Sequence, residues 1–215
     1  MGSALRADTQ AGGWELVSVK DGITTHRREV PGSPVVAIRG EGIVDAPILR
    51  VASVIMDTRR ESEWTDALVE VRRLRTFDKL HYVEYTHIGM PAVLSDREFV
   101  VETRVQIDAA RKQITFQMRS VRDPGEPTTK LVRGDLMQSN YLLTSLDHGT
   151  RTRMVADVHA DPKGSVPSWI VNLFQKSWAH TTITRLRAQV RKPDVHDDEA
   201  LAKLLVQAGL TETAP

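Results

Sequence analysis

The side chains of this chain that could do chemistry are scattered rather than gathered into a catalytic motif. None of its seven histidines stands at the HExxH spacing of zinc peptidases, and there is no GxSxG nucleophile elbow and no phosphate-binding P-loop. The string GEGIVDA holds a single GxG, with Asp45 where a further glycine of a dinucleotide-binding turn would stand. The 215 residues include no cysteine, which excludes thiolate metal sites and thiol nucleophiles. We therefore expect no enzyme, metal or cofactor.

Arg97 is the polar residue whose position is most informative. In REFVVETRVQI, apolar and polar side chains alternate, which is typical of a strand with one buried face. Arg97 shares the face of Phe99 and Val101, so its guanidinium points inward and needs an acceptor. An ion pair with Asp96, Asp66 or another carboxylate is favoured over a contact with the hydroxyl or head group of a ligand.

Four other polar residues lie in predicted strands whose inward face the sequence does not assign: Glu84, Gln138, Asn140 and Tyr141. Any of them could supply the one or two polar contacts that orient a ligand in an apolar pocket. The more common alternative is that such side chains point outward.

The loop IGMPAVL, residues 88–94, joins two predicted strands yet is almost wholly apolar. Gly89 and Pro91 are compatible with a hinge, which favours a lid that covers a ligand and touches a membrane. The alternative is a loop that only packs on the core.

Basic residues without any acidic neighbour mark the segment 163–192, although the formal net charge of the chain is only +1. They are Lys163, Lys176, Arg185, Arg187, Arg191 and Lys192. Docking on an anionic membrane and a simple solvated helix face explain this segment equally well. The small net charge argues against a nucleic-acid partner.

The order of predicted elements indicates an α+β protein with an antiparallel sheet. Two strands, 22–30 and 35–44, form a hairpin, and Asp45 and Pro47 begin a helix of about three turns. Six strands follow at 68–75, 80–88, 97–107, 113–119, 131–144 and 151–160. Because their connections are short and contain no helix, neighbouring strands should be antiparallel. A long helix over 166–190, started by Gly164 or Ser165, and a short amphipathic helix that stops at Gly209 complete the chain.

The long helix changes character along one face. Ile170, Leu173 and Phe174 begin this face, and Ser177 and Thr181 continue it. A face that starts apolar and becomes hydroxyl-bearing suits a partly polar cavity better than a dry core.

Several strings together resemble the START domain family of lipid-transfer modules. They are WELVSVKDGITTHRREVPGSPVVAIRGEGIVDAP, EWTDALVEVRRL, YVEYTHIGMPAVLSDREFV and VHADPKGSVPSWIVN, and they span roughly Trp14 to Lys192. The resemblance implies the helix-grip fold, a curved antiparallel sheet wrapped around the long C-terminal helix, with an apolar tunnel that holds one lipid. Many relatives carry Trp-Pro before the SDR string, whereas this chain has Ala92-Val93, which implies a wider or looser entrance.

These observations define the expected organisation. Residues 1–13 form a flexible segment, 14–192 the START lipid-binding domain and 193–215 a tail with the short helix. The domain is expected to hold a sterol, phospholipid or similar ligand, gated by the 88–96 loop and the long helix. The alternatives are a polyketide cyclase or aromatase on the same fold, with several titratable groups in its cavity, and a lipid sensor that transfers nothing.

The expected ligand contacts are Met90, Val93, Leu94, Arg97, Phe99, Val101, Phe116, Met118, Ile170, Leu173, Phe174, Ser177 and Thr181. Besides the lipid, the only partner expected is a transient membrane surface. We expect a soluble monomer, either cytoplasmic or, if a targeting segment has been removed, periplasmic.

Overall fold

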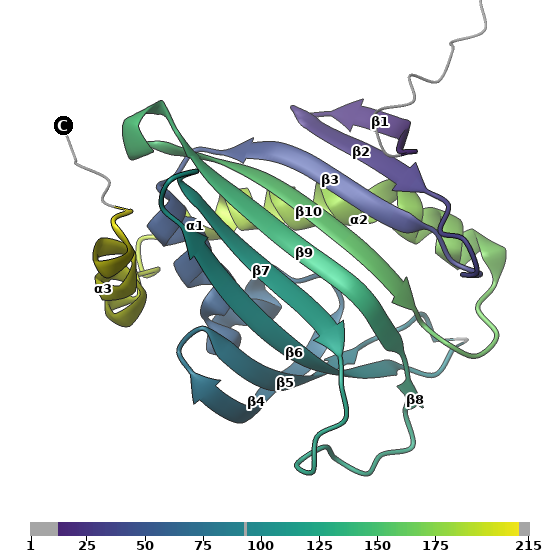
Figure 1. Cartoon of the computed structure of the whole chain (residues 1–215). Helices are drawn as coiled ribbons and strands as arrows, with labels where there is room; N and C mark the ends of the chain where they lie inside the picture. The colour runs from purple at the N-terminus through teal and green to yellow at the C-terminus, as the bar shows by residue number, and fades with distance from the viewer. Residues whose placement is uncertain (1–12, 93, 211–215) are drawn as a thin grey trace, which may run out of the picture.

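A strongly curved antiparallel sheet encloses one long helix in the computed structural model, which describes residues 13–92 and 94–210 (Figure 1). The sheet has the order β1-β2-β3-β10-β9-β7-β6-β5-β4 within the described residues, and the short strand β8 pairs in parallel with β6. Helix α2 (Ser168–Gln189) runs along the concave side of the sheet. The predicted α+β helix-grip fold is confirmed.

The strands follow the predicted hydrophobic pattern, with a few additions. Their bounds are β1 Glu15–Lys20, β2 Ile23–Arg28, β3 Ala37–Val44, β4 Leu68–Asp78, β5 His81–Ile88, β6 Arg97–Asp108, β7 Gln113–Ser120, β8 Val132–Arg133, β9 Asp135–Leu146 and β10 Arg151–Asp161. The sequence prediction missed β1, and it joined β8 and β9 into one strand.

Helix α1 (Ile48–Met56) follows β3, and the 3₁₀ helix η1 (Thr58–Glu63) continues directly from it. The expected cap by Asp45 is wrong, because Pro47 occupies the N-cap position and no side chain in the described part of the chain caps the helix. Asp45 instead pairs with Arg191 at 3.1 Å. Helix α2 begins after Pro167, two residues later than predicted, and no described side chain caps it.

The second half of α2 packs tightly on β3 because two glycines leave room for it. A Cβ atom at Gly40 would lie 2.6 Å from the Cβ of Ala179, and one at Gly42 would lie 3.2 Å from a methyl of Ile183. Ala179 and Ile183 are fully buried. This end of the helix therefore forms solid core.

Helix α3 (Glu199–Ala208) lies beside α1 at one end of the sheet (Figure 1). The side chain of Asp198 accepts a hydrogen bond from the N–H of Leu201, and Gly209 ends the helix in the left-handed conformation, as its pattern predicts. Leu201 and Leu205 are buried in the main core, so α3 is an integral part of the domain. No helix within the described residues is long and apolar enough to cross a membrane.

Candidate ligand-binding site

The concave face of the sheet carries the apolar side chains that the strand alternation predicts. In the register of β6 with β7, Val101 lies opposite Ser120, Thr103 opposite Met118 and Val105 opposite Phe116. Since side chains directly opposite each other share a face, these residues point to the same side. Phe116 then pairs with Tyr141 of β9, which extends the same surface toward α2.

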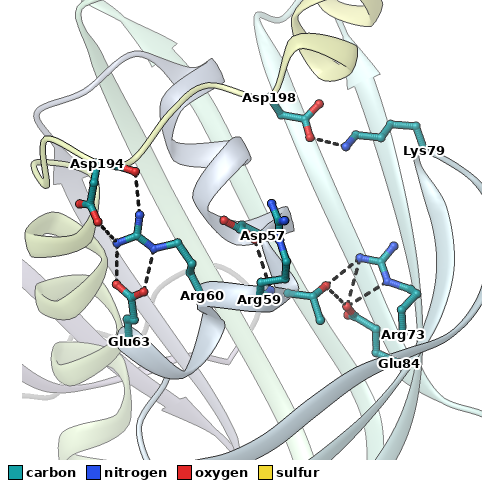
Figure 2. Close-up of polar contacts among 10 residues, drawn as sticks. Asp57, Arg59, Arg60, Glu63, Arg73, Lys79, Glu84, Asp194 and Asp198 are labelled. Atoms are coloured by element: carbon teal, nitrogen blue, oxygen red, sulfur yellow. Dashed lines mark hydrogen bonds and ion pairs between the residues drawn. The ribbon is translucent and has the colours of Figure 1, made fainter.

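Charged side chains stand at one end of this apolar surface, on β4 and β5. Arg73 pairs with Glu84 at 3.1 Å, and the hydroxyl of Thr58 in η1 donates to the same carboxylate at 2.5 Å. Arg73 also donates to Thr58 at 2.9 Å, and its guanidinium lies 3.5 Å from the ring centre of Tyr82. Figure 2 shows Arg73 beside Glu84, and Thr58 closes the network through its hydrogen bonds to both.

Glu84 belongs to the interior side of its strand, because it lies opposite Val101 in the register of β5 with β6. Its side chain is only 12% exposed. A partly buried ion pair that also has a hydroxyl partner is a fixed polar feature in an otherwise apolar surface. It could orient the polar end of an amphiphile.

Glu61 of η1 adds a second carboxyl group near this network. Burial, and secondarily the negative charge of Glu84, raise the pKa of Glu61 to about 8, although Arg73 opposes the shift. Its side chain is therefore mostly protonated at neutral pH. A neutral carboxyl of this kind can donate a hydrogen bond to a carbonyl or hydroxyl oxygen.

Two tyrosines share this environment. Burial raises the pKa of both Tyr82 and Tyr141, and the carboxyl groups nearby, Glu84 for Tyr82 and Glu61 for Tyr141, add to the effect. Both phenols therefore stay neutral at physiological pH. They bring hydroxyl groups to the concave face without adding charge.

The structure places the expected contact residues in three groups. Phe99, Val101, Phe116 and Met118 lie on the concave face of β6 and β7. Ser177 and Thr181 are partly buried on α2. Val93 and the side chain of Leu173 lie outside the described residues.

The other residues of α2 and of the 88–96 loop differ in burial. Ile170 is buried, whereas Phe174 is 43% exposed and packs against Trp178, with ring centres 5.9 Å apart. Met90 and Leu94 are partly buried. Which of these residues touch a ligand remains a prediction.

Arg97 is buried as predicted, with 3% exposure, but its expected ion pair is wrong. Its guanidinium donates to the backbone carbonyls of Ser95, Pro162 and Lys163, the last two at 3.0 and 3.1 Å. Carbonyl oxygens satisfy this buried charge in place of a carboxylate. The expected alternative partner Asp66 pairs with Arg185.

The basic residues of the segment 163–192 are largely engaged with neighbours. Lys163 pairs with Asp161 at 2.8 Å, Lys192 with Glu63 at 2.7 Å, and Arg187 donates to the carbonyls of Asp21 and Ile43. These contacts favour the interpretation of a helix face tied to its own domain over a membrane-docking surface.

Sequence reasoning missed Thr58, Glu61, Arg73 and Tyr82 as members of the site. Glu84 and Tyr141 were candidates without an assigned face. The string VRRLR does not show which face of its strand Arg73 occupies, because the register of β4 with β5 shifts three times along the pair. No periodicity marks η1, because a single 3₁₀ segment is too short to display one.

Comparison with known proteins agrees with this geometry. The crystal structure of human STARD10 superposes with a TM-score of 0.76 and 22% identity, over 91% of this chain and 78% of that one. A STAR-related lipid transfer protein from Xanthomonas axonopodis gives a TM-score of 0.72 and 26% identity, over 84% of this chain and 99% of that one.

Sequence comparison gives the same result. Mouse phosphatidylcholine transfer protein is 24% identical over 168 residues, which are 76% of this chain and 77% of the relative. The family model described as the START domain matches residues 1–194. The chain therefore belongs to the START domain family.

Proposed function

We propose that this chain binds one hydrophobic ligand, a sterol, phospholipid or similar molecule, between the concave face of the sheet and α2, and transfers it between membranes. The observation that carries the proposal is the division of the concave face into an apolar surface on β6 and β7 and one polar network at Arg73 and Glu84. An amphiphile needs both parts. Removing its tail from water contributes about 25 cal/mol for each Å² of apolar area buried.

The 88–96 loop is the proposed gate. Asp96 accepts hydrogen bonds from the N–H of Met90 and from His87, both at 2.8 Å, so one carboxylate holds the two sides of the loop together. Arg97 ties the end of the same loop to the turn before α2. Ligand entry would require these few contacts to open, while the sheet stays intact.

Paired substitutions on one strand test the ligand site. Met118→Trp adds bulk on the concave face of β7, whereas Gln117→Trp adds the same bulk to the neighbouring exposed position on the other face. Mass spectrometry of lipid extracted from the purified proteins, together with transfer between labelled liposomes, should show loss of ligand and of transfer for Met118→Trp alone. Equal loading of both folded variants would contradict the proposed site.

A polyketide cyclase or aromatase is the second candidate, and the titratable groups near the concave face favour it. Glu61, Glu84 and Arg73 could assist proton transfer on a polyketone chain, since a carboxyl with a pKa of about 8 can act as a general acid. Incubation with a polyketone analogue separates the candidates. Turnover that Glu61→Gln abolishes would support the enzyme, and tight binding of intact lipid without turnover would support the carrier. Binding of lipid without transfer would indicate a sensor.

A further inference from the structure

A cavity of about 500 Å³ lies at the end of the domain where α3 packs, and its lining includes Arg73 and Thr58 of the polar network described above. Its wall combines the end of α1, η1, Lys79 in the β4–β5 turn, Gln189 of α2 and the segment 194–198. The family model ends at residue 194, so most of this last segment lies beyond the matched region. The cavity is therefore built partly by residues outside the family match.

Ion pairs stabilise this wall, and most of its carboxylates are paired with a basic side chain. Asp194 pairs with Arg60 at 3.0 Å, Asp197 pairs with Arg50 at 2.5 Å, and Asp198 pairs with Lys79. Arg60 is fully engaged as well, since Glu63 binds it through two further hydrogen bonds of 2.7 and 2.8 Å. These groups stabilise the cavity and have little capacity left for a cation.

Donors in the same cavity remain unused. The side chain of Arg59 is 94% exposed, and its one ion pair within the described residues is with Asp57 at 3.6 Å. Arg73 donates from Nε to Glu84, and its Nη2 contacts Thr58 and Glu84. Its Nη1 therefore has no partner within the described part of the chain. Figure 2 shows Arg59 and Arg73 extending toward one open space, with Lys79 at its far side.

We propose that this cavity binds a phosphate-bearing group between Arg59 and Arg73, with Lys79 as a third contact. Guanidinium groups match phosphate oxygens with paired hydrogen bonds, and a phosphate offers enough oxygens for all three cations. The volume lies in the range of small-molecule sites, so the occupant is a phosphorylated small molecule or a phospholipid head group rather than a bare ion. This site shares Arg73 with the polar network of the ligand site proposed on the concave face, whereas Arg59, Lys79 and the segment 194–198 are not part of that network.

Arg59→Gln tests the proposal without disturbing the fold, because this side chain is solvent-exposed. Arg122→Gln is the matched control, since it removes another exposed arginine with a single carboxylate partner, Glu126, away from the cavity. One arm titrates the full chain with glycerol 3-phosphate and follows the Nε–Hε NMR signals of its arginines. The other arm measures flotation with phosphatidylcholine vesicles that contain or lack phosphatidic acid.

We expect Arg59→Gln to weaken binding of the responding probe about tenfold, as loss of a charge-assisted contact does, and Arg122→Gln to leave it unchanged. A response to glycerol 3-phosphate identifies a soluble phosphorylated ligand, and a response only to phosphatidic acid identifies a head group. The proposal is overturned if neither probe binds, or if both variants lose affinity equally. Loading of apolar lipid on the concave face should be the same in both variants. A negative result for the phosphate site therefore leaves the proposed lipid-binding function untouched.

Discussion

Arg97 donates a 3.0 Å hydrogen bond from Nε to the backbone carbonyl of Pro162, and so joins the start of β6 to the turn before α2. The same guanidinium binds the carbonyls of Ser95 and Lys163. One buried side chain thus fixes the end of the 88–96 loop against the segment that leads into the long helix. This contact makes the proposed gate a single coupled unit.

Replacing Arg97 by Met should loosen the loop and the turn together. Three backbone carbonyls lose a charged donor, which should lower the free energy of unfolding by about 3 kcal/mol. Hydrogen exchange of residues 88–96 and 162–166 should accelerate in both segments. Arg104→Met, on the exposed face of the same strand, is the control and should change neither. Faster exchange in only one segment would contradict the coupling.

The Arg73–Glu84 pair should show strong energetic coupling in a double-mutant cycle. Glu84→Gln leaves a partly buried guanidinium without its carboxylate and should cost about 2 kcal/mol of unfolding free energy. Arg73→Met should cost a similar amount, and the double variant should cost clearly less than the sum of both. Urea unfolding measures all three.

The control cycle uses the neighbouring exposed pair of Glu70 and Arg72, which are 3.4 Å apart and half exposed. Its coupling should stay below about 0.5 kcal/mol, as is usual for surface ion pairs. Equal coupling in the two cycles would show that the network near Glu84 is no better shielded from water than the surface.

The sequence predicted the parts of this protein that depend on local pattern. The alternation in β6 assigned Phe99 and Val101 to one buried face, and Gly209 marked the end of α3. Both signals arise from neighbours along the chain, so one sequence contains them completely.

The polar part of the site could not be predicted from the sequence, because it depends on contacts between segments far apart in the chain. Arg73 lies on a strand whose bulges shift the alternation, so counting residues assigns no face to it. Two of the three carbonyl acceptors of Arg97, those of Pro162 and Lys163, lie 65 and 66 residues away in the sequence. Backbone acceptors carry no residue-type signal, which is why a carboxylate partner was expected instead.

Gly40→Ala should push α2 away from β3. The new methyl group would lie 2.6 Å from the Cβ of Ala179, and a helix backbone can give way only by moving as a whole. The overpacking should cost about 2 kcal/mol of unfolding free energy. Adding Ala179→Gly removes the opposing methyl and should recover part of this loss, although glycine within a helix costs about 1 kcal/mol. Thermal unfolding of the single and double variants measures the recovery, and its absence would contradict tight packing at this crossing.

Glu61 should make the protein less stable as the pH rises. Its pKa is about 8 in the folded chain against an ordinary value of 4.5, so between these values the folded state holds a proton that the unfolded state has lost. Unfolding then releases a proton, and rising pH favours it by about 1.4 kcal/mol per pH unit across this window. Below pH 4.5 both states are protonated and the effect vanishes.

Glu61→Gln keeps the neutral shape of the side chain and should remove this dependence. Urea unfolding from pH 5 to 8 should therefore give a wild-type curve that falls relative to the variant, with the largest gap at the alkaline end. Glu70→Gln, an exposed glutamate on β4, should follow the wild type at every pH. If the wild type and Glu61→Gln ran parallel across the window, the carboxyl of Glu61 would be ionised in the folded state, and its role as a neutral donor toward the ligand would fail with it.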